Sequence, residues 1–150
     1  MAPTTPPAPA SSVSEALPHA LPESNAARLL LLAVRRIGAH GLNDAVAANT
    51  YLSAFGSGFQ RPLVLTRAFM AELAATATAT IPIAPCCCAR MTWAEDAIVT
   101  AIAEAERRPE LTRVLLADLM AQRRADAIAA SAAAVAAAFA DAGMPLAAGA

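Results

Sequence analysis

The chain has 150 residues, of which 57% are hydrophobic, and a formal net charge of −1 at pH 7. This length is typical of one domain with a substantial core. The near-zero charge argues against a nucleic-acid-binding protein, which usually carries a strongly basic surface. All 11 basic residues are arginine, which excludes mechanisms that need a lysine nucleophile or a lysine Schiff base.

Alanine is abundant, and aromatic residues make up only 4% of the sequence. Because alanine has the highest helix propensity, we expect an all-α protein, a compact bundle of roughly six helices with closely approaching axes. The predicted helices cover residues 26–39, 44–55, 62–77, 93–107, 110–121 and 124–142.

The chain is expected to begin with a disordered tail over residues 1–22, which hold six of the 11 prolines. Such a segment buries too little apolar surface to offset the entropy lost on ordering. A single helical domain is predicted over residues 23–146, and residues 147–150 are predicted to be a flexible C-terminus.

Helix-capping residues define the starts of the first two helices. Ser24 or Asn25 is expected to cap the first, and Asn43 or Asp44 the second. In the first helix, Arg28 and Arg35 lie seven residues apart and are expected on one solvent-facing stripe. The inward stripe predicted for the second helix consists of Ala45, Ala48, Leu52 and Phe55.

The segment from Ile81 to Met91 is predicted to be an apolar loop packed on the core. Pro82 and Pro85 exclude a regular helix there. A loop of this length is often functional. It ends just before a capping box, in which Thr92 and Glu95 satisfy each other's backbone donors at the start of the next helix.

The last predicted helix, residues 124–142, places Ile128, Val135 and Phe139 on one stripe and alanine over most of its remaining surface. Such a helix is either sandwiched inside the bundle or in contact with a second copy of the chain. The predicted partner is therefore an unknown protein, or a homo-oligomer formed through this helix.

The cellular compartment is predicted from sequence features that the chain lacks. The N-terminus has no positively charged region followed by a continuous apolar stretch, as a signal peptide has. No window is long and apolar enough to span a membrane. An odd number of cysteines, three, fits reduced thiols better than a disulfide framework. We therefore expect a cytoplasmic protein with no membrane contact.

The one group of residues with unusual chemistry is the run Cys86, Cys87 and Cys88, at the end of the predicted loop. Four interpretations are open. The thiols can act as small buried apolar groups, form a redox sensor through a reducible disulfide or sulfenate, bind a soft metal ion, or supply a nucleophile with His40 as its base. A zinc site is disfavoured because its cysteines are normally separated by two to four residues.

Arginines near the loop bear on thiol reactivity. Residues 25–91 contain six arginines against two acids, a formal balance of +4, whereas residues 92–150 have a balance of −3, with five arginines against eight acids. Arg90, Arg35, Arg36 and Arg61 are therefore candidates to support a thiolate or an anion. The alternative is that the two halves pack together and neutralise each other.

Several segments together resemble an uncharacterised family of short proteins from sphingomonad-type alphaproteobacteria. They are residues 33–36 (Ala-Val-Arg-Arg), 41–45 (Gly-Leu-Asn-Asp-Ala), 61–63 (Arg-Pro-Leu), 84–88 (Ala-Pro-Cys-Cys-Cys) and 90–92 (Arg-Met-Thr). The resemblance implies a bacterial cytosolic setting and no assigned activity.

No paired acids and no phosphate-binding glycine loop are present in the sequence. We therefore expect a non-enzymatic helical interaction or regulatory protein without a cofactor. The alternative is a thiol-based redox sensor or soft-metal binder that uses Cys86 to Cys88.

Overall fold

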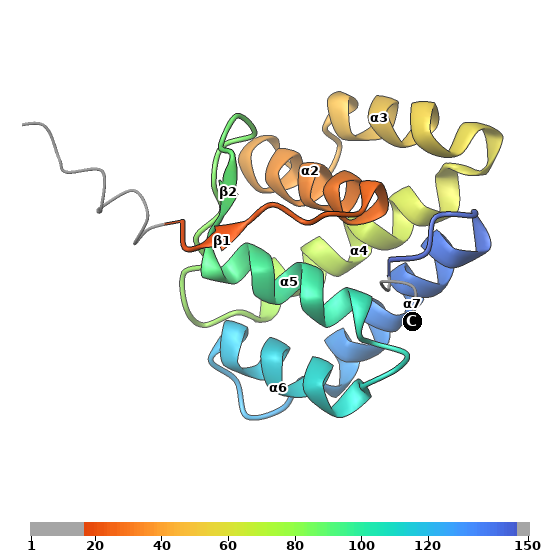
Figure 1. The fold of residues 1–150 in the computed structure, drawn as a ribbon. Helices are drawn as coiled ribbons and strands as arrows, with labels where there is room; N and C mark the ends of the chain where they lie inside the picture. Colours follow the sequence, from red (N-terminus) through yellow and green to blue (C-terminus); the bar gives the residue numbers. More distant parts are fainter. Residues whose placement is uncertain (1–16, 147–150) are drawn as a thin grey trace, which may run out of the picture.

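The computed structural model describes residues 17–146, and every structural statement below refers to them. Within this range the chain forms six α-helices, which confirms the all-α prediction (Figure 1). The elements are β1 (His19–Ala20), α2 (Asn25–His40), α3 (Ala45–Phe55), the 3-10 helix η1 (Gly56–Gly58), α4 (Gln60–Thr76), β2 (Arg90–Met91), α5 (Trp93–Ala103), α6 (Pro109–Met120) and α7 (Asp126–Asp141).

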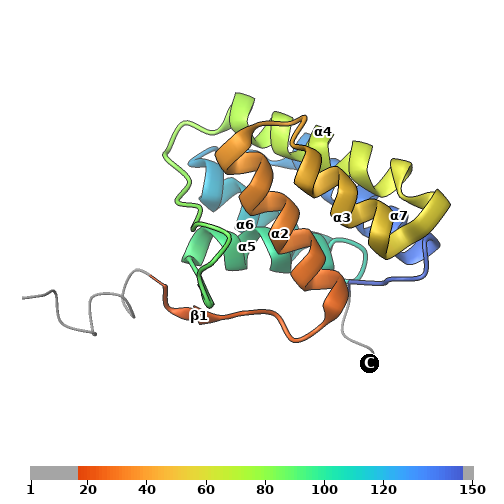
Figure 2. The same ribbon diagram turned by 90° about the horizontal axis from the view of Figure 1, so that it is seen from above.

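Helix α2 lies inside the molecule and packs against α3, α4 and α5. The Ser24 hydroxyl accepts a hydrogen bond from the Ala27 N–H (3.1 Å) and caps its first turn. Gly41 ends the helix with a φ of 99°, a conformation that favours glycine. Viewed from above, α2 runs between the N-terminal segment on one side and α3 on the other (Figure 2).

Helix α7 packs against α4, α5 and α6, and its predicted stripe of Ile128, Ala132, Val135 and Phe139 is buried. The helix is therefore sandwiched inside the bundle, and this apolar stripe is covered by the same chain. The close contacts with neighbouring helices explain why its surface is mostly alanine.

The inward face of α3 differs from the predicted one. Ala47 and Tyr51 are buried, Phe55 is partly buried, and Leu52 is 45% exposed. The Tyr51 hydroxyl hydrogen-bonds to the Thr66 hydroxyl (3.0 Å), and its ring packs edge-on against Phe55 and Phe139. Burial of this larger side chain, with a partner for its hydroxyl, decides the orientation of the helix.

The N-terminal part of the described chain pairs with a central segment in a small two-stranded sheet, and two ranges at the chain ends lie outside the described residues. Residues 1–16 of the predicted tail and the predicted flexible C-terminus, 147–150, are not described. Strand β1 pairs antiparallel with β2, His19 opposite Met91 and Ala20 opposite Arg90. No helix between residues 17 and 146 is both long and apolar enough to cross a membrane.

Candidate functional site

The three cysteines lie in the irregular segment between α4 and β2, as predicted from its prolines. The Cys88 N–H donates a hydrogen bond to the Pro85 carbonyl (3.1 Å), so residues 85–88 form a β-turn with Cys86 and Cys87 at its corners. Cys86 and Cys87 are exposed, whereas Cys88 is partly buried. The interpretation that all three are buried apolar groups is therefore wrong for Cys86 and Cys87.

Arg35 is the residue whose position departs most from expectation. It is only 3% exposed and forms a two-point ion pair with the fully buried Glu95. Its Nε lies 2.7 Å from Glu95 Oε2, and its Nη2 lies 3.2 Å from Glu95 Oε1. The prediction of a solvent-facing Arg35 is wrong because α5 and the cysteine segment cover this end of the stripe, while Arg28 at the other end remains exposed.

The same guanidinium also holds the backbone of the cysteine segment. Arg35 Nη1 donates to the Cys88 carbonyl (2.8 Å), and Nη2 donates to the Arg90 carbonyl (2.8 Å). We call Arg35, Glu95 and these two carbonyls the arginine clamp. The clamp joins α2, α5 and the cysteine segment through one planar side chain, which suits a guanidinium better than an ammonium.

The capping box at the start of α5 completes the clamp. Glu95 Oε1 accepts a hydrogen bond from the Thr92 N–H (2.9 Å), and Thr92 Oγ1 accepts one from the Glu95 N–H (3.0 Å), which confirms the prediction. Thr92 Oγ1 also donates to the Pro82 carbonyl (2.7 Å). Glu95 therefore caps the helix and neutralises Arg35, and the second role was missed. The opposite net charges of the two halves were the only sequence signal for it.

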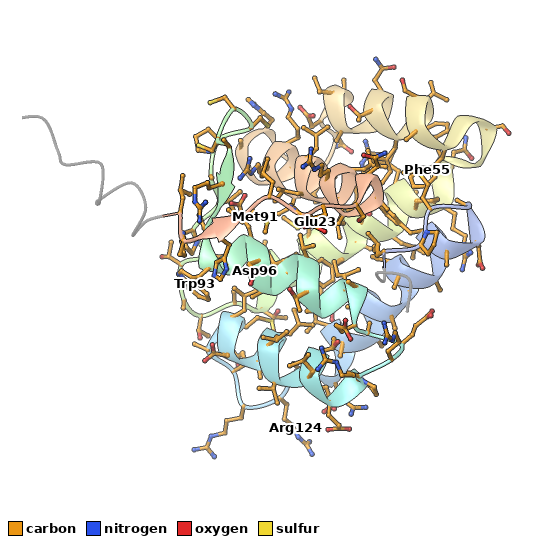
Figure 3. All side chains as sticks on the ribbon, viewed as in Figure 1. Glu23, Phe55, Met91, Trp93, Asp96 and Arg124 are labelled. Carbon is orange, nitrogen blue, oxygen red and sulfur yellow. The ribbon has the colours of Figure 1, made fainter. Side chains whose placement is uncertain are left out.

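Arg90 connects the cysteine segment to the N-terminal residues. Its Nε donates to the Leu17 carbonyl (2.8 Å), and its Nη2 donates to the Pro18 carbonyl (2.7 Å). Residues 17–22, which the sequence assigned to the tail, instead pair with β2 and reach α5, where His19 Nδ1 lies 3.6 Å from Asp96 Oδ2. Figure 3 shows Met91 and Asp96 on this side of the molecule.

Of the other predicted arginines, one lies beside the thiols and one does not. Arg36 is held by both carboxylate oxygens of Asp44 (2.8 and 3.0 Å). This hydrogen bonding raises the pKa of Arg36, and the nearby Cys86 contributes in the same direction. Arg61 instead pairs with Asp141 at the end of α7 (2.7 Å). Arg35 and Arg61 therefore pair with acids of the C-terminal half, as mutual neutralisation of the two halves predicts, whereas Arg36 pairs with an acid of its own half and Arg90 bonds to carbonyls.

The carboxyl of Asp44 is affected more strongly than its partner. Hydrogen bonds from Arg36 and from the Ala47 N–H, which Asp44 caps (2.9 Å), lower the pKa of Asp44 to about 2. His40, exposed at the end of α2, acts in the same direction.

A small pocket of about 160 Å³ opens beside the cysteine turn. Cys86 and Cys88 both line it, and Cys87 does not. Its other lining residues come from α2 and the N-terminal segment: Leu21, Arg28, Leu31, Leu32 and Arg35. Two of the three sulfur-bearing residues thus share one partly apolar cavity.

One known protein family matches nearly the whole of the described chain. The model of a family of unknown function, DUF6628, matches residues 9–143. The chain belongs to this family. No curated protein and no solved structure matches the chain. The DUF6628 match spans α2 to α7, and therefore includes the cysteine turn and the arginine clamp.

The arrangement of potential metal ligands in this DUF6628 protein bears on the soft-metal interpretation. Among residues 17–146, no group of three or more His, Cys, Asp or Glu side chains is positioned to hold a metal ion. Cys86 and Cys87 occupy successive corners of a turn, where adjacent side chains diverge, and this geometry does not suit a tetrahedral centre.

Proposed function

We propose that the protein is a non-enzymatic regulatory protein of the bacterial cytosol whose input is oxidation of Cys86 and Cys88 to a disulfide. The observation that supports this most directly is that both residues line one pocket at an exposed turn. Redox-sensing cysteines are typically solvent-accessible and close to a second, resolving cysteine. Cys86 is exposed and Cys88 is partly buried, which suits these two roles in that order.

The oxidant we propose for these thiols is a low-molecular-weight disulfide. The Cys86 thiolate attacks one of its sulfurs, which forms a mixed disulfide and releases one thiolate. The Cys88 thiolate then attacks the Cys86 sulfur, which forms the protein disulfide and releases the second thiolate. The two protons lost from Cys86 and Cys88 end on the two released thiols, so one disulfide is reduced as one is formed.

Chain geometry favours the pair Cys86 and Cys88 over either adjacent pair. The Cα atoms of neighbouring residues are about 3.8 Å apart across a trans peptide. Unstrained disulfides need a Cα separation of about 4.4–6.8 Å. Residues two apart in a turn can reach this range, whereas adjacent residues cannot without distortion. Arg36, in addition, places a positive charge near Cys86, the sulfur that attacks first.

The test is to incubate the reduced protein with oxidised glutathione and map the product by mass spectrometry after alkylation of the remaining thiols. We expect one internal disulfide between Cys86 and Cys88, with Cys87 alkylated. Cys87→Ser is the matched control and should still form the bond, whereas Cys86→Ser and Cys88→Ser should stop at a mixed disulfide or remain reduced. Native thiols that all resist oxidation would contradict the proposal.

A second candidate is a helical interaction protein that binds through the outer face of α3. Val46 and Leu52 are 46% and 45% exposed there, and both line an open groove of about 510 Å³ that includes Phe59. Exposed large apolar groups that share a groove are typical of interaction surfaces. Self-association in analytical ultracentrifugation that Leu52→Glu abolishes would support this function, and a monomer at all concentrations would count against self-association.

A further inference from the structure

We propose that residues 17–22 form a redox-controlled strap, which the Cys86–Cys88 disulfide releases from β2 and α5. This inference rests on the proposed oxidation of these two thiols and adds its structural consequence. In the described chain, the strap precedes the first helix of the bundle and is bonded to the strand that follows the cysteines.

Most attachments of the strap lead to Arg90 and Met91, which follow the cysteines after one alanine. The carbonyls of Leu17 and Pro18 accept hydrogen bonds from Arg90, and β1 pairs with β2. Two further contacts lie outside β2: the Pro22 carbonyl accepts a hydrogen bond from Arg28 Nε (2.6 Å), and His19 lies near Asp96. The outer half of the strap is therefore held through Arg90 and Met91.

The backbone position of Arg90 is in turn linked to that of Cys88 through Arg35. Arg35 donates to the carbonyls of Cys88 and Arg90, on either side of Ala89, so one rigid guanidinium sets the spacing between them. A change in the backbone at Cys88 must either break its bond to Arg35 or move the peptide that leads into β2. Arg90, which holds the strap, is therefore only two residues along the chain from Cys88, whose sulfur oxidation would move.

Disulfide formation acts on this short connection. The step joins the two sulfurs and removes one hydrogen from each thiol, while the low-molecular-weight disulfide takes up both hydrogens and becomes two thiols. The Cys88 side chain must then turn toward Cys86 within the turn that the Cys88 N–H and Pro85 carbonyl close. Leu21 of the strap lines the same pocket as both cysteines, so the new bond forms beside an apolar side chain of the strap.

The strap is expected to give way before the core does. Arg90 is exposed, and its bonds to Leu17 and Pro18 are exposed to water. The pair of Arg35 and Glu95, by contrast, is buried and tied to the capping box. Segments with few buried contacts and water-exposed hydrogen bonds open at the lowest free-energy cost.

The experiment is hydrogen–deuterium exchange on the full chain, reduced and after oxidation by glutathione disulfide, with the disulfide quantified in the same samples. In the oxidised protein, we expect peptides covering residues 17–24 to exchange at least about tenfold faster, since release of the strap breaks the β1–β2 ladder that protects its amides. Peptides from α7 should not change. Arg90→Ala should give fast strap exchange even in the reduced protein.

Cys87→Ser is the matched control, and it should keep both the disulfide and the oxidation-dependent exchange. Cys88→Ser should show slow strap exchange with or without oxidant. A disulfide that forms while strap exchange stays within twofold of the reduced protein would overturn the strap and leave the sensor proposal intact. Absence of the disulfide would overturn both proposals. Faster exchange in α7 as well would mean general unfolding and would also overturn the strap.

Discussion

The cysteine end of the molecule and the aromatic end are held together by different kinds of interaction. Figure 3 shows the two ends far apart, with Met91 near one and Phe55 near the other. At the cysteine end, a buried ion pair and its backbone hydrogen bonds join α2, α5 and an irregular segment. At the aromatic end, Tyr51, Phe55 and Phe139 pack edge-to-face, with ring centroids 5.1–5.8 Å apart.

This difference affects what each end can do. Aromatic and alanine packing is short-ranged and depends mainly on volume. A buried ion pair adds little net stability compared with apolar residues, yet it is costly to break because one charge is left without its partner. The arginine clamp therefore contributes mainly by specifying one position for a loop that contains no regular structure. That property suits the segment in which we propose that Cys86 and Cys88 form a disulfide.

The largest expected effect comes from breaking the clamp. Glu95→Ala leaves the Arg35 guanidinium buried without a counter-charge and removes half of the capping box. We expect the free energy of unfolding to fall by about 3–5 kcal/mol, measured by urea denaturation of the reduced protein. The double variant Arg35→Met with Glu95→Ala should recover part of this loss, because no charge then remains buried.

Glu104→Ala is the matched control for this prediction. Glu104 follows α5, and its carboxylate pairs with the exposed Arg108 (2.9 Å). Removal of such a surface pair should cost less than about 1 kcal/mol. If Glu95→Ala cost no more than Glu104→Ala, the clamp would not differ from an ordinary surface ion pair, and the contrast between the two ends would disappear.

An intermediate effect is expected from the apolar packing around α7, the helix that carries Phe139. Ala132 is fully buried on α7, so Ala132→Leu inserts three carbon atoms where no space is available. Overpacking of this kind typically costs about 1–3 kcal/mol. Ala130→Leu, at an exposed position of the same helix, should leave the unfolding free energy within about 0.5 kcal/mol of the wild type. Equal effects of the two variants in urea denaturation would show that α7 is not tightly enclosed.

Local sequence patterns were sufficient to predict the helices and most of their ends. Ser24, Asp44 and Thr92 cap helices as their types indicate. The orientation of α3 was missed because the stripe containing Leu52 and the stripe containing Tyr51 are both apolar. The choice between them depends on Phe139, which is distant in sequence and meets Tyr51 only in the folded bundle.

The candidate site could be predicted in part. The cysteine loop follows from its prolines, but the burial of Arg35 does not follow from helical periodicity. Arg28 and Arg35 occupy the same stripe, and only the segment that folds over one end of α2 distinguishes them. That segment lies 53 residues further along the chain, beyond the range of any helical repeat. The strap was missed for the same reason, because its partners, Arg90 and Met91, are 70 or more residues away.

The smallest expected effect concerns Arg36 and Asp44, the ion pair next to the buried one, and it appears as a dependence on pH. The pKa of Asp44 is lowered from 3.8 to about 2 in the folded protein. A lowered folded-state pKa means that the charged carboxylate stabilises the fold above pH 3.8, and that this contribution is lost as the pH falls toward 2.

The substitution Asp44→Asn keeps a side chain able to cap α3 but removes the charge. The difference in unfolding free energy between wild type and Asp44→Asn should therefore be constant above about pH 5 and shrink steadily between about pH 4 and pH 2. Asp44→Ala, which also removes the cap, should add a loss of about 1 kcal/mol that remains at low pH. A difference between wild type and Asp44→Asn that does not change over this pH range would mean that the charge of Asp44 adds nothing, and that Arg35 alone of the two neighbouring arginines makes an ion pair that stabilises the fold.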